Sequence, residues 1–276
     1  MKIVTDTSTF FSPEEGRRMG ITVIPSCSVI DGEVFRDYED IDTDGLLERI
    51  RNGGIPTTSQ PSIGEVMDAF EETDEEILFL SIGDGLSGTY QNAVGVKNSI
   101  DDGERVHIID TKTLGGPHRY LVQKAMRLNK EGWSLETIKK ELYKSIETSV
   151  SFVIPADFDF LKRSGRLTPI AAKIGGLIKI VPVLTQTADK KRIAPFVVKR
   201  ARKKAVDAII DYLKSMGVDE NYIVSISHAG VSELAEAVLA QIKAQIANAA
   251  YELFSLSPAL VTHGGPGCVV IQAIRK

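Results

Sequence analysis

The chain has 276 residues, of which 43% are hydrophobic and 25% are charged, as in an ordinary globular protein. Its formal net charge of -4 gives no general attraction for nucleic acid or for an anionic membrane. No apolar run approaches the ~18 residues that span a bilayer, and residues 1–6 lead into a strand-like segment without an apolar signal region. We therefore expect a cytoplasmic protein with no integral membrane segment and no nucleic-acid partner.

The two cysteines, Cys27 and Cys268, lie in apolar strand-like segments far apart in the sequence. This placement favours reduced thiols in a core over a disulfide or a metal site. We predict neither a bound metal nor a cofactor.

Residues 1–150 alternate predicted strands with predicted helices, which indicates a doubly wound, mostly parallel sheet. Buried strands are expected at 2–5, 77–81 and 105–110, with helices at 13–19, 42–51, 62–70, 89–98, 115–130 and 134–148. The Asp31-Gly32 turn between residues 21–30 and 33–35 predicts a β-hairpin. The length favours two domains over one, since a typical domain has ~150 residues. We place the boundary at residue 150, where the predicted helix at 134–148 ends.

Two hydroxyl-rich segments in this first half are candidates for ligand binding. In the first, at 56–62, Ser62 is predicted to cap a helix, which leaves Thr58 and Ser59 without a structural task. In the second, Ser87, Gly88 and Thr89 follow a buried strand and precede a helix. Free amides at a helix N-terminus suit phosphate or carboxylate oxygens, although the segment is neither GxGxxG nor a P-loop.

A third candidate is the segment at residues 262–267, predicted to be a polar loop before the last strand. His263 is its only titratable side chain, so proton or charge chemistry there falls to this residue. Taken alone, the segment also fits a glycine-rich turn with a surface histidine. Near the N-terminus, residues 6–9 either face a ligand crevice or cap the helix at 13–19, and the sequence leaves both open.

The second half, residues 151–276, predicts a second α/β domain with a mixed or antiparallel sheet. Strands are expected at 151–155, 180–185, 192–198, 222–227, 251–255 and after 267, with helices beginning at 158, 199 and 232. Residues 171–178 mix small and large aliphatic side chains, which suits either core packing or a slot for a long hydrocarbon. Five of the six residues at 199–204 are basic, and they form either a solvated face or a docking patch for an acidic partner or phosphate.

A serine hydrolase is the alternative enzymatic hypothesis. It would use Ser87 as nucleophile and His263 as base, with Asp6 or Asp110 orienting the histidine. Ser87 lacks the G-x-S-x-G setting of a nucleophile elbow, which counts against this hypothesis.

Several segments together resemble the DegV family of bacterial fatty-acid-binding proteins. They are Thr58-Ser59-Gln60-Pro61-Ser62, Leu86-Ser87-Gly88-Thr89-Tyr90, Gly165-Arg166, Arg200 in its basic segment, and His263 with Gly265-Pro266-Gly267. They occur in family order over nearly the whole chain. The resemblance implies a two-domain α/β carrier that is not an enzyme. It would bury one long-chain fatty acid between its domains and, in several members, present the carboxyl group to a fatty-acid kinase for phospholipid metabolism.

Carried over to this sequence, the resemblance implies roles for particular residues. Thr58 and Ser87 would hydrogen-bond the carboxyl group and His263 would contact it, with Ser59, Gly88, Thr89 and Gly264 completing the site. Arg200, or Arg202 if the alignment shifts by two residues, would engage the partner or assist phosphoryl transfer, together with Arg166. The chain departs from the family pattern at Asp84, Val181, Gly264 and residues 115–118.

Overall fold

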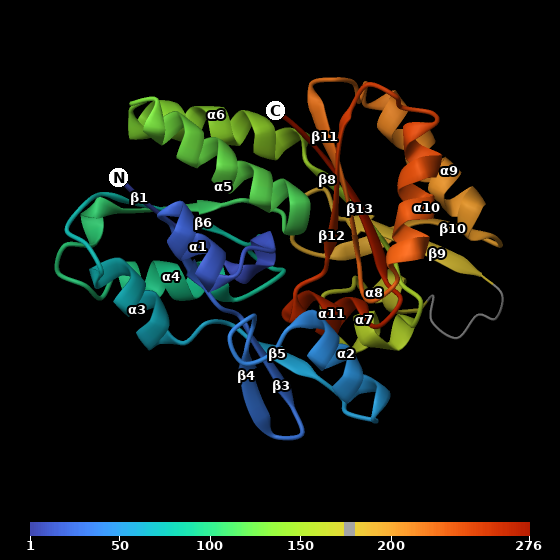
Figure 1. Cartoon of the computed structure of the whole chain (residues 1–276), viewed down its shortest axis with the longest axis horizontal. Helices are drawn as coiled ribbons and strands as arrows, with labels where there is room; N and C mark the ends of the chain where they lie inside the picture. The colour runs from blue at the N-terminus through green and yellow to red at the C-terminus, as the bar shows by residue number, and fades with distance from the viewer. Residues whose placement is uncertain (174–179) are drawn as a thin grey trace.

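The computed structural model describes residues 1–173 and 180–276 (Figure 1). Its N-terminal half contains a four-stranded parallel sheet, which confirms the prediction for this part of the chain. In spatial order the strands are β2 (Thr22–Ile24), β1 (Lys2–Asp6), β6 (Ile77–Ser81) and β7 (Val106–Asp110). The carboxyl ends of β1, β6 and β7 therefore lie along one edge of this sheet.

The C-terminal half forms a six-stranded mixed sheet, also as predicted. In spatial order its strands are β10 (Ile193–Lys199), β9 (Val181–Gln186), β8 (Val150–Ile154), β13 (Val269–Arg275), β11 (Tyr222–His228) and β12 (Ala250–Ser255). Neighbouring strands are antiparallel except β11 and β12, which run parallel.

Helices α5 (Gly115–Lys130) and α6 (Leu135–Thr148) lie between the two sheets (Figure 1). Their buried side chains share one cluster with Leu78 and Leu80 of β6 and with Ile223 and Ile274 of the six-stranded sheet. On the far side of the parallel sheet, α3 (Ile63–Glu71) and α4 (Thr89–Lys97) bury Phe70 and other apolar side chains. The two sheets are thus joined by a continuous apolar layer.

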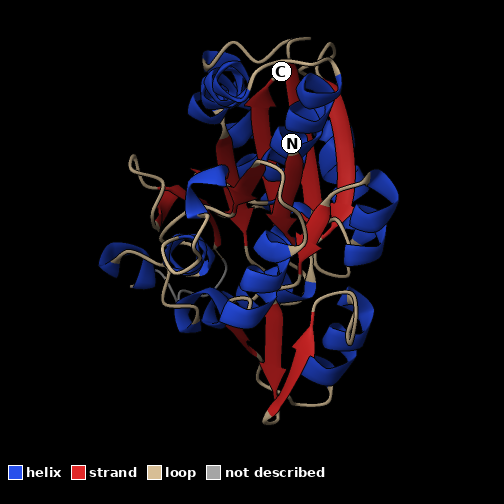
Figure 2. Ribbon diagram, turned by 90° about the vertical axis from the view of Figure 1, so that its left-hand side faces the viewer, coloured by secondary structure: helices blue, strands red, loops and turns tan. Residues whose placement is uncertain are grey.

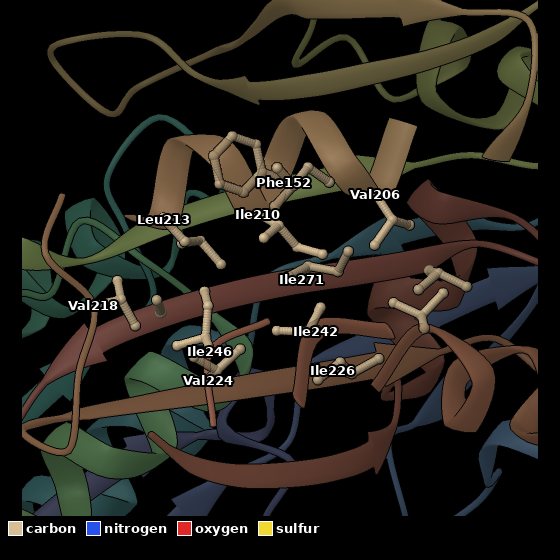
Figure 3. Close-up of a cluster of buried hydrophobic side chains, with 14 of the residues drawn as sticks. Phe152, Val206, Ile210, Leu213, Val218, Val224, Ile226, Ile242, Ile246 and Ile271 are labelled. Atoms are coloured by element: carbon tan, nitrogen blue, oxygen red, sulfur yellow. The ribbon is translucent and has the colours of Figure 1, made fainter. Parts of the chain in front are cut away.

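The opposite face of the six-stranded sheet is covered by α9 (Arg202–Ser215) and α10 (Ser232–Lys243). Figure 3 shows the core between these helices and the sheet. Val206, Ile210 and Leu213 of α9 pack in one cluster with Phe152 of β8 and Ile271 of β13. The helix expected to begin at residue 199 begins at Arg202, because Lys199 still pairs with Val181 in the sheet.

A small antiparallel sheet of β4 (Glu33–Arg36), β3 (Cys27–Ile30) and β5 (Thr57–Ser59) extends away from the two larger sheets (Figure 2). The hairpin of β3 and β4 was predicted, but two expectations were wrong. Residues 21–30 are two strands in different sheets, because Pro25 between them has no backbone N–H for a ladder. Residues 57–59, expected to be a loop, pair with β3 at its edge.

Another correction concerns the predicted loop at 262–267. Helix α11 (Pro258–Gly264) includes Thr262, His263 and Gly264 in its last turn. Pro258 is preorganised for the first helical position, and the helix continues until Gly265, whose φ of 76° is favourable only for glycine. His263 therefore projects from the last turn of a helix and not from the predicted polar loop.

The remaining elements complete the chain. They are η1 (Thr7–Thr9), α1 (Pro13–Met19), α2 (Thr43–Arg51), η2 (Gly103–Arg105), α7 (Phe158–Arg163) and α8 (Pro169–Ala172). Of the segment at 171–178 that combines small and aliphatic residues, residues 174–178 lie outside the described part of the chain. Ala171, which is described, packs with Leu161, Leu167 and Leu184.

Candidate functional site

A narrow cavity of about 80 Å³ lies against the six-stranded sheet, α7 and α11, and its lining is mainly apolar. Its apolar lining comprises Leu86, Leu114, Val153, Leu161, Ile193, Leu256, Leu260, Gly264, Cys268 and Val270. Polar side chains of Ser151, Thr185 and Gln186 contribute at the sheet, and His263 lies beside Gly264. Such a lining favours a hydrocarbon over a polar ligand.

A second cavity of about 80 Å³ adjoins the first, and its lining is rich in hydroxyl groups. The two cavities share Leu86, Leu114, Ile193, Leu260 and His263. The second adds the polar side chains of Ser8, Ser26, Thr58, Ser59, Ser87, Ser164 and Arg166. The two cavities are therefore neighbours, one with a mainly apolar lining and the other with a hydroxyl-rich lining that we call the hydroxyl-lined end.

An open hollow of about 460 Å³ lies outside the hydroxyl-lined end and shares Ser87, Ser164 and Arg166 with it. Gly88, Lys191 and Arg192 also line this hollow. The arrangement gives the cavity a polar and partly charged mouth.

Thr58 and His263 face each other across the hydroxyl-lined end. The Oγ1 atom of Thr58 lies 2.9 Å from the Nε2 atom of His263, so that edge strand β5 contacts the last turn of α11. Burial, with the nearby positive charge of Arg166, lowers the pKa of His263 to about 3. The imidazole is therefore neutral at physiological pH and offers one donor and one acceptor.

Ser87 lies at the start of α4, and its contacts are with Thr89. The two hydroxyl oxygens are 2.9 Å apart, and the Thr89 backbone N–H donates to Ser87 Oγ at 3.3 Å. Thr89 is fully buried and holds Ser87 at the cavity wall. The hydrolase hypothesis needs a contact between Ser87 and His263, and over residues 1–173 and 180–276 the imidazole bonds Thr58 instead.

Arg166 connects the two halves of the chain at the cavity. Its Nε–H donates to the carbonyl of Leu86 at 3.0 Å, and an Nη1–H donates to the carbonyl of Ser164. Burial alone lowers the pKa of this guanidinium, with no contribution from a carboxylate in the described chain. Within the described residues its other N–H groups have no hydrogen-bond partner, so they can bind a ligand oxygen.

Two departures from the family pattern have a structural explanation. The Asp84 carboxylate lies 2.9 Å from Lys191 Nζ and 3.2 Å from Gln91 Nε2, and the bond from Lys191 keeps the pKa of this acid low. Its charge is thus neutralised at the mouth. At Gly264, a Cβ atom would lie 2.9 Å from the sulfur of Cys268, so a larger residue would displace that buried thiol.

Arg200 and Arg202 are exposed and do not line the cavity. Strand β10 starts at Ile193, which contacts both cavities, and ends at Lys199. At ~3.3 Å per residue, Arg200 lies roughly 20 Å along the strand from the cavity. The structure therefore brings Arg166 into the site, whereas Arg200 and Arg202 lie elsewhere.

Four residues near the hydroxyl-lined end were not among the predicted site residues: Ser8, Ser26, Ser164 and His118. Of these, Ser8 lay in the segment at 6–9, for which two roles were left open. Helix α1 is capped by Ser12 in a capping box with Glu15, so the capping role is wrong, whereas Ser8 lines the cavity. Its position after β1, at the carboxyl edge of a parallel sheet, was the available signal.

The described residues contain neither a metal-binding cluster nor a membrane-spanning helix. Within ranges 1–173 and 180–276, no group of three or more His, Cys, Asp or Glu side chains is arranged to hold a metal. Among the helices described, none is both long and apolar enough to cross a bilayer.

The fold and the site define an α/β protein in which two sheets and a small hairpin sheet surround a narrow cavity, apolar at one end and hydroxyl-lined at the other. The chain belongs to the DegV family. The family model, described as an uncharacterised protein of the DegV family, matches residues 1–276.

The chain is similar to other DegV proteins both in sequence and in structure. A DegV domain-containing protein of Caldanaerobacter subterraneus subsp. tengcongensis is 30% identical over 96% of this chain and 95% of its own length. A fatty-acid-binding DegV family protein from Thermus thermophilus is similar with a TM-score of 0.88 and 28% identity, covering 100% of this chain and 99% of the other. DegV from Bacillus subtilis, a fatty acid binding protein, has a TM-score of 0.86, 28% identity and the same coverage.

Proposed function

We propose that this protein is a cytoplasmic, non-enzymatic carrier that buries one long-chain fatty acid. The observation that carries the proposal is the pair of adjoining cavities, one apolar and one hydroxyl-lined, that share five lining residues. A fatty acid requires an apolar slot for its tail and a few convergent polar groups for its head. The fatty-acid-binding relatives from Thermus thermophilus and Bacillus subtilis support the same ligand class.

In this proposal the two halves of the chain divide the task. Residues 1–150 supply most head-group contacts, with Thr58 and Ser87 as hydrogen-bonding hydroxyls. Residues 151–276 supply most of the apolar lining together with His263 and Arg166. Ser59, Gly88, Thr89 and Gly264 shape the site: Ser59 and Gly264 line the cavities, Gly88 lines the mouth, and Thr89 holds Ser87.

The proposal includes presentation of the bound carboxyl group to a fatty-acid kinase. The mouth beside Gly88 and Arg166 is the opening through which a kinase would reach the carboxyl group. Arg200 lies roughly 20 Å from the cavity along the direction of β10, and Arg202 opens α9 beyond it, which suits docking of the partner and not contact with the ligand. The exposed cations at 200–204 would steer an acidic surface toward this face.

Native mass spectrometry of the protein purified from bacteria tests the carrier function. We expect a co-purified mass that corresponds to one long-chain fatty acid, which is released on denaturation. An empty protein that binds no added fatty acid would contradict the proposal. Turnover of ester substrates by such an empty protein would favour a hydrolase.

A further inference from the structure

A second histidine, His118 of α5, lies behind the hydroxyl-lined end of the cavity. It is fully buried, and its Nδ1 atom is 2.9 Å from the Oγ atom of Ser8, which lines the cavity. Its Nε2 atom lies 3.0 Å from the carbonyl oxygen of Leu80 and 3.2 Å from the Oγ1 atom of Thr5. The ring thus links the core of the parallel sheet to the wall of the cavity.

The surrounding hydrogen bonds assign the tautomer of His118. Thr5 donates its hydroxyl proton to the carbonyl of Leu80 at 2.9 Å, so neither oxygen beside Nε2 has a proton to offer the ring. Nε2 must therefore carry the ring proton and donate it. Burial lowers the pKa of His118, which keeps the imidazole neutral. Nδ1 is consequently unprotonated and accepts the hydroxyl proton of Ser8.

This assignment fixes what Ser8 can offer a ligand. A serine hydroxyl has one proton and two acceptor lone pairs, and the proton is committed to His118. Toward the cavity Ser8 is therefore an acceptor only. Arg166, which shares the cavity, is by contrast a donor only. The hydroxyl-lined end accordingly has an acceptor on the side of β1 and a donor on the side of α7.

We propose that His118 orients Ser8 as a hydrogen-bond acceptor, so that the head-group site selects ligands whose terminal group carries a proton. This inference rests on the proposed function. An undissociated fatty acid or a fatty alcohol would donate to Ser8, whereas a carboxylate or a methyl ester would place lone pairs against lone pairs. Ser8 is thus a specificity-determining residue and His118 its positioning residue.

Several charged or titratable groups lie near His118 and Ser8 and affect the charge state of the ring or of a bound head group. Asp6 and Asp110, at the ends of β1 and β7, act electrostatically on His118, and Asp6 also accepts the backbone N–H of Ser8. His263 and Arg166 line the cavity. The imidazole of His263 is neutral, whereas the guanidinium of Arg166 is positively charged and by itself favours a carboxylate. Arg166 can hold a carbonyl oxygen of either the acid or the ester, so discrimination between them falls to Ser8.

The test compares three ligands with the same tail: hexadecanol, hexadecanoic acid and methyl hexadecanoate. Dissociation constants are measured for wild type, Ser8→Ala and His118→Phe. In wild type we expect hexadecanol to bind about tenfold more tightly than the methyl ester. In Ser8→Ala, hexadecanol should lose that advantage while the ester keeps its affinity. In His118→Phe, Ser8 regains a free proton, so the ester should bind more tightly than it does to wild type.

The results distinguish a Ser8 that selects the head group from a Ser8 that only supports the cavity wall. If Ser8→Ala weakens the alcohol and the ester by the same factor, Ser8 only supports the wall and the inference is overturned. Because His118→Phe removes a buried polar group and this change can prevent folding, the Ser8→Ala comparison decides by itself in that case. If wild type binds none of the three ligands, the proposed carrier function is overturned, and this inference with it.

Discussion

The imidazole of His263 and the hydroxyl of Thr58 are 205 positions apart in sequence, yet their Nε2 and Oγ1 atoms lie 2.9 Å apart. This contact joins α11 of the C-terminal half to edge strand β5 of the N-terminal half. It lies at the hydroxyl-lined end of the cavity, which both side chains line.

We expect Thr58→Ala, His263→Ala and Ser87→Ala each to weaken fatty-acid binding without unfolding the protein. Each removes a polar group from the cavity wall, and a lost hydrogen bond to an undissociated carboxyl group costs about 0.5–1.5 kcal/mol. Titration calorimetry gives the affinities, and thermal unfolding checks the fold. The matched control is Thr57→Ala, which truncates the exposed neighbour on the same strand. Unchanged affinity in all three variants would remove the head-group assignment.

The stability of the protein should depend on pH through His263. The folded pKa of about 3 lies below the ordinary value of 6.5, so the unfolded chain binds a proton first. The free energy of unfolding therefore falls as pH drops below about 6.5 and continues to fall toward pH 3. At pH 5 the contribution of this residue reaches at most about 2 kcal/mol.

Thermal unfolding of wild type and His263→Gln at pH 7 and pH 5 measures this effect. Glutamine retains hydrogen-bonding capacity but does not titrate. Other groups contribute to both proteins, so wild type should lose more stability than the variant. Parallel losses would mean that the folded imidazole titrates normally.

Asp37 should hold α11 in place. This fully buried carboxylate accepts the backbone N–H of Ala259 at 3.1 Å and the hydroxyls of Thr7 and Ser28 at 3.3 and 3.4 Å. Asp37→Ala leaves these donors unsatisfied, and we expect a loss of on the order of 3 kcal/mol in stability, with weaker ligand binding because α11 carries His263.

The control for this variant is Asp40→Ala, which removes an exposed carboxylate bound to Arg36 and should change stability by no more than about 0.5 kcal/mol. Burial raises the pKa of Asp37 to about 7. The contribution of Asp37 to stability is therefore present below about pH 4 and is lost as pH rises to about 7, opposite in sign to the contribution of His263, and Asp37→Ala should lack this contribution. Equal stability of the two variants would contradict the assigned role.

Substitutions of Arg166 in the cavity and of Arg200 outside it should have different effects on fatty-acid binding and on acyl-phosphate formation. Arg166→Ala removes a guanidinium from the cavity and should weaken fatty-acid binding. Arg200→Ala should leave affinity nearly unchanged but strongly lower acyl-phosphate formation when a fatty-acid kinase and ATP are added. If docking is electrostatic, the wild-type rate should fall as salt rises. Arg202→Ala belongs in the same assay, and rates equal to wild type for both exposed arginines would exclude the basic segment from transfer.

The hydropathy pattern alone was enough to place most strands and helices, because their burial is periodic along the chain. The parallel sheet and the mixed sheet were predictable in this way, and the cap of Ser62 with Glu65 three positions later was predictable from residue type and spacing. Family order further indicated Thr58, Ser87 and His263 as site residues. These features depend on local sequence or on motif order.

What only the tertiary structure decided was pairing between distant residues. The local sequence of residues 57–59 predicted a loop, whereas their pairing with β3 as an edge strand places Thr58 in contact with His263. Likewise, nothing near His118 indicates Ser8, which lies 110 positions earlier and meets the ring only when α5 packs against β1. A side chain's neighbours across a cavity depend on the packing of whole elements, and sequence periodicity specifies which face of an element is buried but not which residue it meets.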